Sequence, residues 1–185
     1  MPAPMEILSE HAAGSSPTSA LIAALVGQGV DVAALLRRVE KGAIDPFRMD
    51  RIRPLSRTAF EFAAPGDDET LGAVTFLVRD EDGEVGDICA WAPGHFTGLW
   101  LGRGALLGAH RIFAPRLSEG LPVFDRILPW LEASCRGVVV LDLSTALPLL
   151  RRAAPLHAQS LALARTLRLA FERRPPRILV SKGAP

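Results

Sequence analysis

Two apolar runs joined by a tight turn constrain the fold of this chain more than any other feature. The runs are LGAVTFLVRD at 71–80 and EVGDICAWAP at 84–93. Glu81, Asp82 and Gly83 lie at their junction, which is typical of a short β-hairpin. A second turn, PGHFTG, and a third strand-like segment, LWLG, follow directly. We therefore predict an antiparallel meander.

Helical and strand patterns on both sides of the meander indicate a mixed fold. Upstream, Thr18 or Ser19 is placed to cap a helix that runs to Val26, and Asp31 to cap a second helix. Downstream, the apolar run GVVVLD predicts a strand buried on both faces, two helices are expected after it at 144–154 and 157–174, and PPRILVS predicts an edge strand. The predicted class is α+β (mixed α/β): a meander of about four to six strands packed against helices, with an N-terminal helical segment.

A chain of 185 residues fits one domain. Residues 1–17 have small side chains and prolines without periodicity, which predicts a flexible N-terminal arm. Residues 18–185 form the single α/β domain. Within it we expect helices and a basic connector over 18–57, the antiparallel sheet over 58–113, and a mixed α/β half over 114–185.

Cysteine use and hydropathy indicate a cytoplasmic protein. Only Cys89 and Cys135 are present, which is too few for a disulfide framework and fits a reducing compartment. No apolar run approaches the roughly 20 residues that span a bilayer, so we expect no membrane contact. The N-terminus carries acids but no basic residue, unlike the start of a secretory signal.

Charge is distributed unevenly along a chain whose net charge is only +1. Residues 61–87 carry nine acids and one base, whereas 37–57 carry seven bases against three acids and 151–185 carry eight bases against one acid. Basic ends on an acidic body are one mark of a nucleic-acid contact. The alternative is mutational, because a GC-rich genome also produces 19 arginines beside only two lysines.

The glycine-rich stretch 87–108 concentrates the side chains most typical of a binding site. Trp91 and Trp100 flank the turn PGHFTG, where they are placed for a cross-strand aromatic contact. With His95 and Arg103 nearby, they form a candidate stacking platform for nucleic-acid bases. The structural alternative, favoured for at least one tryptophan, is that they belong to the core.

The leading functional hypothesis is a non-enzymatic binding protein that contacts nucleic acid (DNA or RNA) or a protein partner through its basic ends. Phosphate contact there makes binding strongly dependent on salt. The candidate contact residues are Arg37, Arg38, Arg51, Arg53, Trp91, His95, Trp100, Arg103, Arg165, Arg168, Arg173 and Arg174. No catalytic residue and no oligomeric state are predicted.

Motifs of common catalytic and cofactor sites are absent from the sequence. The four histidines never fall at metal-ligand spacing, and neither G-x-S-x-G nor a P-loop occurs. Gly102, Gly104 and Gly108 are misspaced for a dinucleotide fingerprint, so tight turns explain them better. No cofactor is expected. The alternative is magnesium at Asp142, whose structural role would instead be to cap the helix that begins near Ser144.

Five short segments carry a family resemblance, in the order FEF at 60–62, DICAW at 87–91, WLG at 100–102, PWL at 129–131 and CRGVVVLD at 135–142. Together they resemble a group of uncharacterised proteins encoded in prophage and other mobile elements of alphaproteobacteria. The resemblance implies a bacterial, cytoplasmic protein from a phage-like setting and carries no catalytic residues.

A second likeness lies in residues 138–147, VVVLDLSTAL. This segment resembles the strand-to-helix turn of Toprim-type domains of primases and topoisomerases. It implies the alternative function, a magnesium-dependent nucleotide or nucleic-acid enzyme of degenerate Toprim-like type that uses Asp142. The chain departs from that family because Asp142 stands where the family has glutamate, and no later D-x-D pair follows.

Overall fold

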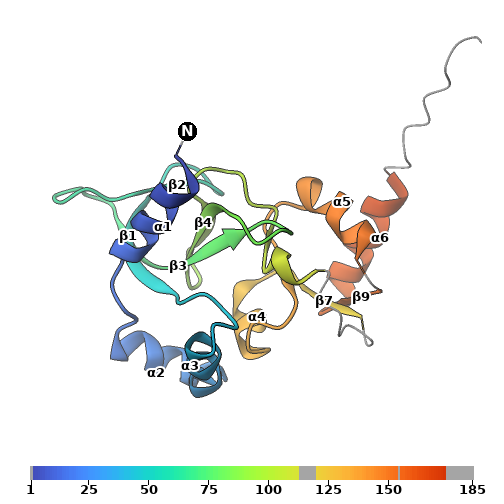
Figure 1. Ribbon diagram of the computed structural model, residues 1–185, viewed down its shortest axis with the longest axis horizontal. Helices are drawn as coiled ribbons and strands as arrows, with labels where there is room; N and C mark the ends of the chain where they lie inside the picture. The colour runs from blue at the N-terminus through green and yellow to red at the C-terminus, as the bar shows by residue number, and fades with distance from the viewer. Residues whose placement is uncertain (1, 113–119, 154, 174–185) are drawn as a thin grey trace, which may run out of the picture.

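The computed structural model describes residues 2–112, 120–153 and 155–173, which form two sheets and six α-helices (Figure 1). The helices are α1 (Pro4–Ala13), α2 (Ser19–Gly27), α3 (Val32–Glu40), α4 (Ile127–Glu132), α5 (Leu143–Arg152) and α6 (Leu161–Arg173), with a 3-10 turn η1 (Ala109–Arg111). The strands are β1 (Arg48–Pro54), β2 (Phe60–Phe62), β3 (Leu71–Arg79), β4 (Val85–Ala92), β5 (Phe96–Leu99), β6 (Leu106–Leu107), β7 (Leu121–Phe124), β8 (Val138–Val140) and β9 (Leu156–Ala158). The α+β class is confirmed. The segment PPRILVS lies outside the described residues.

The first sheet contains the predicted meander. Its five strands have the order β2-β1-β3-β4-β5, and every pairing is antiparallel. The sheet curls until its two edges meet, because the Leu99 N–H donates to the Thr58 carbonyl at 2.9 Å and Ala59 bridges Leu99. The curl gives this sheet an inside and an outside.

Strands β3 and β4 are buried on both faces, which explains their nearly continuous apolar sequence. Inside the curl, Ile88 and Ala90 pack in a core cluster that includes Ile7 of α1. Outside it, Phe76 and Trp91 pack in a second cluster with residues from α2, α3 and α4. Helices α2, α3 and α4 thus cover the outer face of the first sheet (Figure 1).

The second sheet has a different topology from the meander. Its strand order is β6-β8-β7-β9; β7 pairs in parallel with both β8 and β9, and a helix follows each of these three strands. We predicted a largely antiparallel sheet and a helix already under way at His157. Instead residues 156–158 form β9, a short edge strand that pairs in parallel with β7.

Two further expectations are wrong. Residues 4–13 of the predicted flexible arm form helix α1, because Ile7 and His11 are only 1% and 3% exposed and plug the curled sheet. Part of the predicted basic connector is β1, a central strand of the first sheet. Its charged residues conceal the strand pattern, although Ile52 is completely buried.

The predicted helix caps are confirmed. Thr18 Oγ1 accepts a hydrogen bond from the Leu21 N–H at 3.3 Å and begins α2. Asp31 Oδ1 accepts from the Ala34 N–H at 2.8 Å and begins α3. Helix α3 therefore has a defined start, and its last turn carries Arg37 and Arg38.

Candidate functional site

The stretch 87–108 contains the β4–β5 hairpin and the loop after it. Its two tryptophans pack in different core clusters, one on each side of the first sheet. Trp91 is paired with Thr97 across the hairpin, not with Trp100. Trp91 is 6% exposed in the outer cluster, whereas Trp100 is half-buried on the inner side and meets the Phe62 ring edge-on at 5.2 Å between centroids. The predicted Trp91–Trp100 contact is therefore wrong, and the expectation of a core role is confirmed for Trp91.

A buried acid that the sequence does not single out organises the loop after the hairpin. Asp87 is fully buried and accepts hydrogen bonds from the backbone N–H groups of Ile88, Leu101 and Arg103 at 2.7, 2.8 and 2.7 Å. The Arg103 side chain itself is exposed. Asp87 thus anchors loop backbone and faces no open site.

The glycines of this stretch have structural explanations. Gly102 and Gly108 take positive φ angles of 68° and 79°. A Cβ atom on Gly104 would lie 2.6 Å from Val78 Cγ1, so only glycine fits there. The predicted turn geometry accounts for Gly102 and Gly108, whereas close packing, which was not predicted, accounts for Gly104.

The predicted basic contact residues do not form one surface. Arg37 and Arg38 lie at the end of α3, whereas Arg165 and Arg168 lie on α6 at the far end of the molecule's long axis (Figure 1). Arg168 is paired with Glu172 at 2.9 Å. The side chain of Arg173 and the whole of Arg174 lie outside what the structure describes.

The arginines of β1 are also engaged locally. Arg51 donates to the Thr70 hydroxyl, and Arg53 forms an ion pair with Glu61 on the neighbouring strand. Both side chains are exposed, and each already has a hydrogen-bond or ion-pair partner. At the end of α3, by contrast, Arg38 is half-buried, and its buried Nε has no hydrogen-bond partner in the described part of the chain.

The structure brings Arg111, which lies on η1, within electrostatic range of Arg38. Both side chains are half-buried, and the charge of Arg38 helps to lower the pKa of Arg111, although burial is the larger cause. Among the described residues, neither guanidinium forms an ion pair with a carboxylate, and the buried Arg38 Nε has no hydrogen-bond partner. Arg37 and Lys41 lie near Arg38 in sequence, Arg136 follows Cys135, whose carbonyl Arg111 bonds, and all three side chains are exposed. We call these five side chains the arginine rim.

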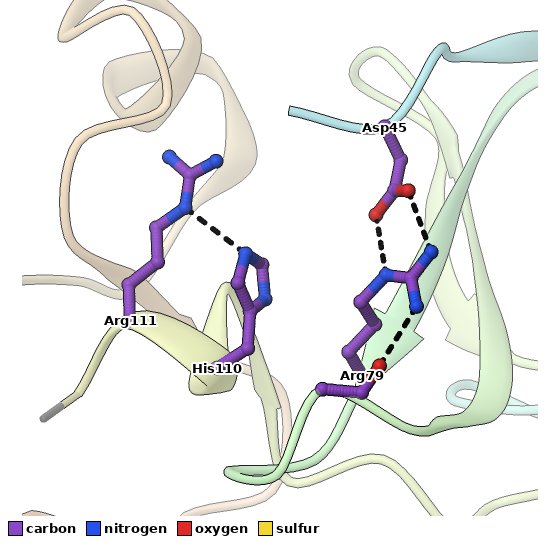
Figure 2. A network of polar contacts seen from close by, with 5 residues as sticks. Asp45, Arg79, His110 and Arg111 are labelled. Atoms are coloured by element: carbon purple, nitrogen blue, oxygen red, sulfur yellow. Dashed lines mark hydrogen bonds and ion pairs between the residues drawn. The ribbon is translucent and has the colours of Figure 1, made fainter. Parts of the chain in front are cut away.

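Asp45, a carboxylate whose charge acts on Arg111, already forms an ion pair with Arg79. Figure 2 shows His110 between Arg111 and a bidentate pair in which Arg79 donates to both oxygens of Asp45, each at 2.8 Å. That ion pair lowers the pKa of Asp45, although burial opposes it. Arg111 Nε instead donates to His110 Nε2 at 3.0 Å. Burial and then the Arg111 charge lower the pKa of His110, which favours the neutral ring that accepts this bond.

A tight turn behind the arginine rim positions Arg111. The Arg111 side chain donates from Nη1 to the Cys135 carbonyl at 3.2 Å. Ser134 and Cys135 both adopt left-handed backbone conformations, with φ of 54° and 56°, which is uncommon for residues with a side chain. Burial raises the pKa of the Cys135 thiol to about 12, so this cysteine acts here through its backbone and not as a nucleophile.

Two hollows lie beside these elements. The one against Asp45, Arg111 and Cys135 holds about 30 Å³, room for one or two water molecules, so larger ligands meet only its rim. The other holds about 750 Å³ and runs between the β4–β5 hairpin and the loop from β7 to α4. Trp91 and His95 both line it. We call this second hollow the hairpin groove.

Asp142 fills its predicted structural role. Its carboxylate accepts hydrogen bonds from the Ser144 N–H and hydroxyl at 3.0 and 2.9 Å and from the Thr145 hydroxyl, which caps α5 and lowers the Asp142 pKa. Across the described part of the chain, no group of three His, Cys, Asp or Glu side chains is arranged to hold a metal ion. Magnesium binding at Asp142 stays a prediction.

Comparison with known proteins gives no identity for the chain. No family model, curated protein or solved structure matches it. The prophage and Toprim resemblances therefore stay predictions. None of the described helices is long and apolar enough to cross a membrane.

The sequence does not single out Arg111. It is one of 19 arginines, and its meeting with Arg38, 73 positions earlier, depends on how η1 and α3 pack on the first sheet. Only the neighbouring pair Arg37 and Arg38 was open to prediction, from the basic block in which it lies.

Proposed function

We propose that this chain is a nucleic-acid-binding protein that takes phosphate groups on the arginine rim. The observation that carries the proposal is that two half-buried guanidinium groups, Arg38 and Arg111, lie within electrostatic range of each other, with no carboxylate paired to either among the described residues. The resemblance to mobile-element proteins and the two free, buried cysteines fit a bacterial cytoplasmic setting.

Phosphate is the ligand that this arrangement favours. Guanidinium groups present planar pairs of donors that match phosphate oxygens, and they lose less on partial desolvation than ammonium groups do. Two like charges held together at a half-buried site repel each other, and a bound anion removes that repulsion. Arg38 Nε, which is buried and has no hydrogen-bond partner among the described residues, would gain one by turning toward the anion.

The surroundings favour a strand of nucleic acid over a single small anion. Arg37 and Lys41 lie near Arg38 in sequence, Arg136 follows Cys135, and all three are exposed, so further cations are available to a second phosphate. The small cavity beneath is closed by aromatic rings, Phe47 against Phe76 at 5.9 Å and Phe76 against Trp130 at 6.0 Å between centroids. A ligand therefore lies across the rim, as a phosphate backbone does.

Affinity for single-stranded DNA and RNA at low salt tests the proposal, with fluorescence anisotropy as the readout. The double variant Arg38→Gln, Arg111→Gln removes the central pair, and Arg165→Gln, Arg168→Gln removes two charges from α6 as a matched control. We expect at least a tenfold loss of affinity for the rim variant and less than a threefold loss for the α6 variant.

Because Arg111 also bonds the Cys135 carbonyl, Arg38→Glu is measured separately and the folding of each variant is checked by urea denaturation. Equal losses from the rim and α6 variants would mean that only net charge matters, and the rim would lose its role. No affinity for any nucleic acid at low salt refutes the proposed function and favours a protein partner.

A further inference from the structure

The hairpin groove has the features of a site for a flat, partly polar ligand. It lies where β7 and β8, two parallel strands, end, and the crevice beyond the carboxyl ends of such strands is where open α/β sheets bind ligands. Its volume of about 750 Å³ lies within the usual range for small-molecule sites. Neither the arginine rim nor the small cavity uses these residues.

The lining combines an apolar floor with polar groups at the edges. Trp91 and Leu141 contribute apolar surface, and Gln28, His95 and Asp125 contribute both donors and acceptors. His95 is exposed at the hairpin turn, where Pro93 and Gly94, with a φ of 74°, bend the chain, and the His95 N–H closes the turn on the Ala92 carbonyl at 3.0 Å. The turn of the hairpin thus places His95 at the edge of the hairpin groove.

We infer that the hairpin groove takes one unstacked nucleobase from the strand whose phosphates lie on the arginine rim. This inference rests on the proposed function. A base offers a flat apolar face to a floor of this kind and hydrogen-bonding edges to an amide, a carboxylate and an imidazole. At the edge of the groove Asp125 and Arg126 form a net-neutral pair at 3.7 Å, which suits an uncharged ring better than a phosphate.

Gln28 and helix α3 connect the two surfaces along the chain. Gln28, which lines the groove, ends α2 three residues before Asp31 caps α3, and Arg38 lies in the last turn of α3. At 1.5 Å per residue, the helix axis from Asp31 to Arg38 covers about 10 Å. A single strand covers that length with a few nucleotides, so one ligand reaches both surfaces.

The inference makes binding depend on an unpaired base. A base in a duplex is stacked and paired, so it enters the groove only from a single strand. We therefore compare a single-stranded oligonucleotide with an abasic oligonucleotide of the same length and phosphate number, at one low salt concentration. The base-containing strand is expected to bind roughly 5- to 150-fold more tightly, the usual range for one stacked base.

Two tryptophan substitutions locate the effect. Gln28→Trp fills the groove from its edge, whereas Gln159→Trp places the same side chain on an exposed glutamine after β9, outside the groove lining. We expect Gln28→Trp to bring the base-containing strand to within about threefold of the abasic strand, and Gln159→Trp to leave the preference unchanged.

The outcomes separate this inference from the proposed function. If the wild-type protein binds both strands with equal affinity, the groove takes no base, and phosphate binding at the rim stands. If a preference exists but survives Gln28→Trp, the base is recognised elsewhere and the inference is wrong. If neither strand binds, the proposed function itself fails.

Discussion

Substitution of Asp87 by asparagine tests whether the stretch 87–108 is first of all a structural element. The Asp87 carboxylate is fully buried; Oδ1 accepts from the Ile88 and Leu101 N–H groups, and Oδ2 accepts from the Arg103 N–H. Asparagine keeps one acceptor oxygen for the Ile88 and Leu101 N–H groups but presents an NH2 group to the Arg103 N–H. One charge-assisted hydrogen bond is lost, and a buried N–H stays unsatisfied.

The expected cost follows from these contacts. Loss of a hydrogen bond to a charged group costs about 1.5–3 kcal/mol, and weakening of the remaining two adds to it, so we expect about 2–4 kcal/mol of lost unfolding free energy. For a chain of this size each kcal/mol shifts Tm by about 2–4 °C, which predicts a fall of roughly 5–15 °C. Asp87→Ala, which removes all three bonds, should cost more.

Urea denaturation at neutral pH measures the effect, with Asp82→Asn as the matched control. Asp82 is exposed in the turn between β3 and β4, where Asp80 and not Asp82 accepts the backbone hydrogen bonds. The control should change stability by less than about 0.5 kcal/mol, as surface substitutions usually do. An equally small effect for Asp87→Asn would refute the anchoring role.

Three further predictions concern stability. Burial lowers the pKa of His11 below its ordinary 6.5; the unfolded chain therefore takes up a proton first, and unfolding free energy should fall as pH drops below about 6.5, less steeply in His11→Asn. An unchanged slope in that variant would contradict this assignment. Gly137→Ala should cost at least about 1–2 kcal/mol in urea denaturation, because φ is 87° and the new Cβ would meet the Pro122 carbonyl, whereas alanine at Gly86, which has open space, should be tolerated. Asp142→Ala should lower the unfolding free energy by about 1 kcal/mol through loss of the α5 cap. Millimolar magnesium should leave the Tm of the wild type and of this variant unchanged. A rise in Tm confined to the wild type would support the enzyme alternative.

Local signals explain what the sequence predicted well. Thr18 and Asp31 cap their helices through side-chain contacts three residues away, so the pattern that predicts them is complete within one turn. The β3–β4 hairpin is equally local, because Gly83 with a φ of 89° closes it. These elements required no knowledge of the rest of the fold.

Tertiary partners explain what the sequence missed. Helix α1 has little amphipathic pattern, and it forms because Ile7 and His11 fill the opening of the curled sheet. The strand β1 carries charged residues that obscure its period. The short strand β9 forms by pairing with β7, 35 positions earlier.

The candidate site shows the same division. Arg37 and Arg38 stand out as part of a basic block, but the contribution of Arg111 depends on a contact between distant segments. Conversely, the basic segment on α6 looks equivalent in sequence, yet it lies at the far end of the molecule and Arg168 is already paired with Glu172 (Figure 1). Charge content alone does not separate the two.

The salt dependence of single-stranded DNA binding tests the central claim most directly. Each phosphate contact on a single strand contributes about 0.7 to the slope of log affinity against log salt. We predict that Arg38→Gln, Arg111→Gln lowers this slope by about 1.4, and that Arg165→Gln, Arg168→Gln leaves it unchanged. A rim variant with the wild-type slope would contradict the assignment of phosphate contacts to Arg38 and Arg111.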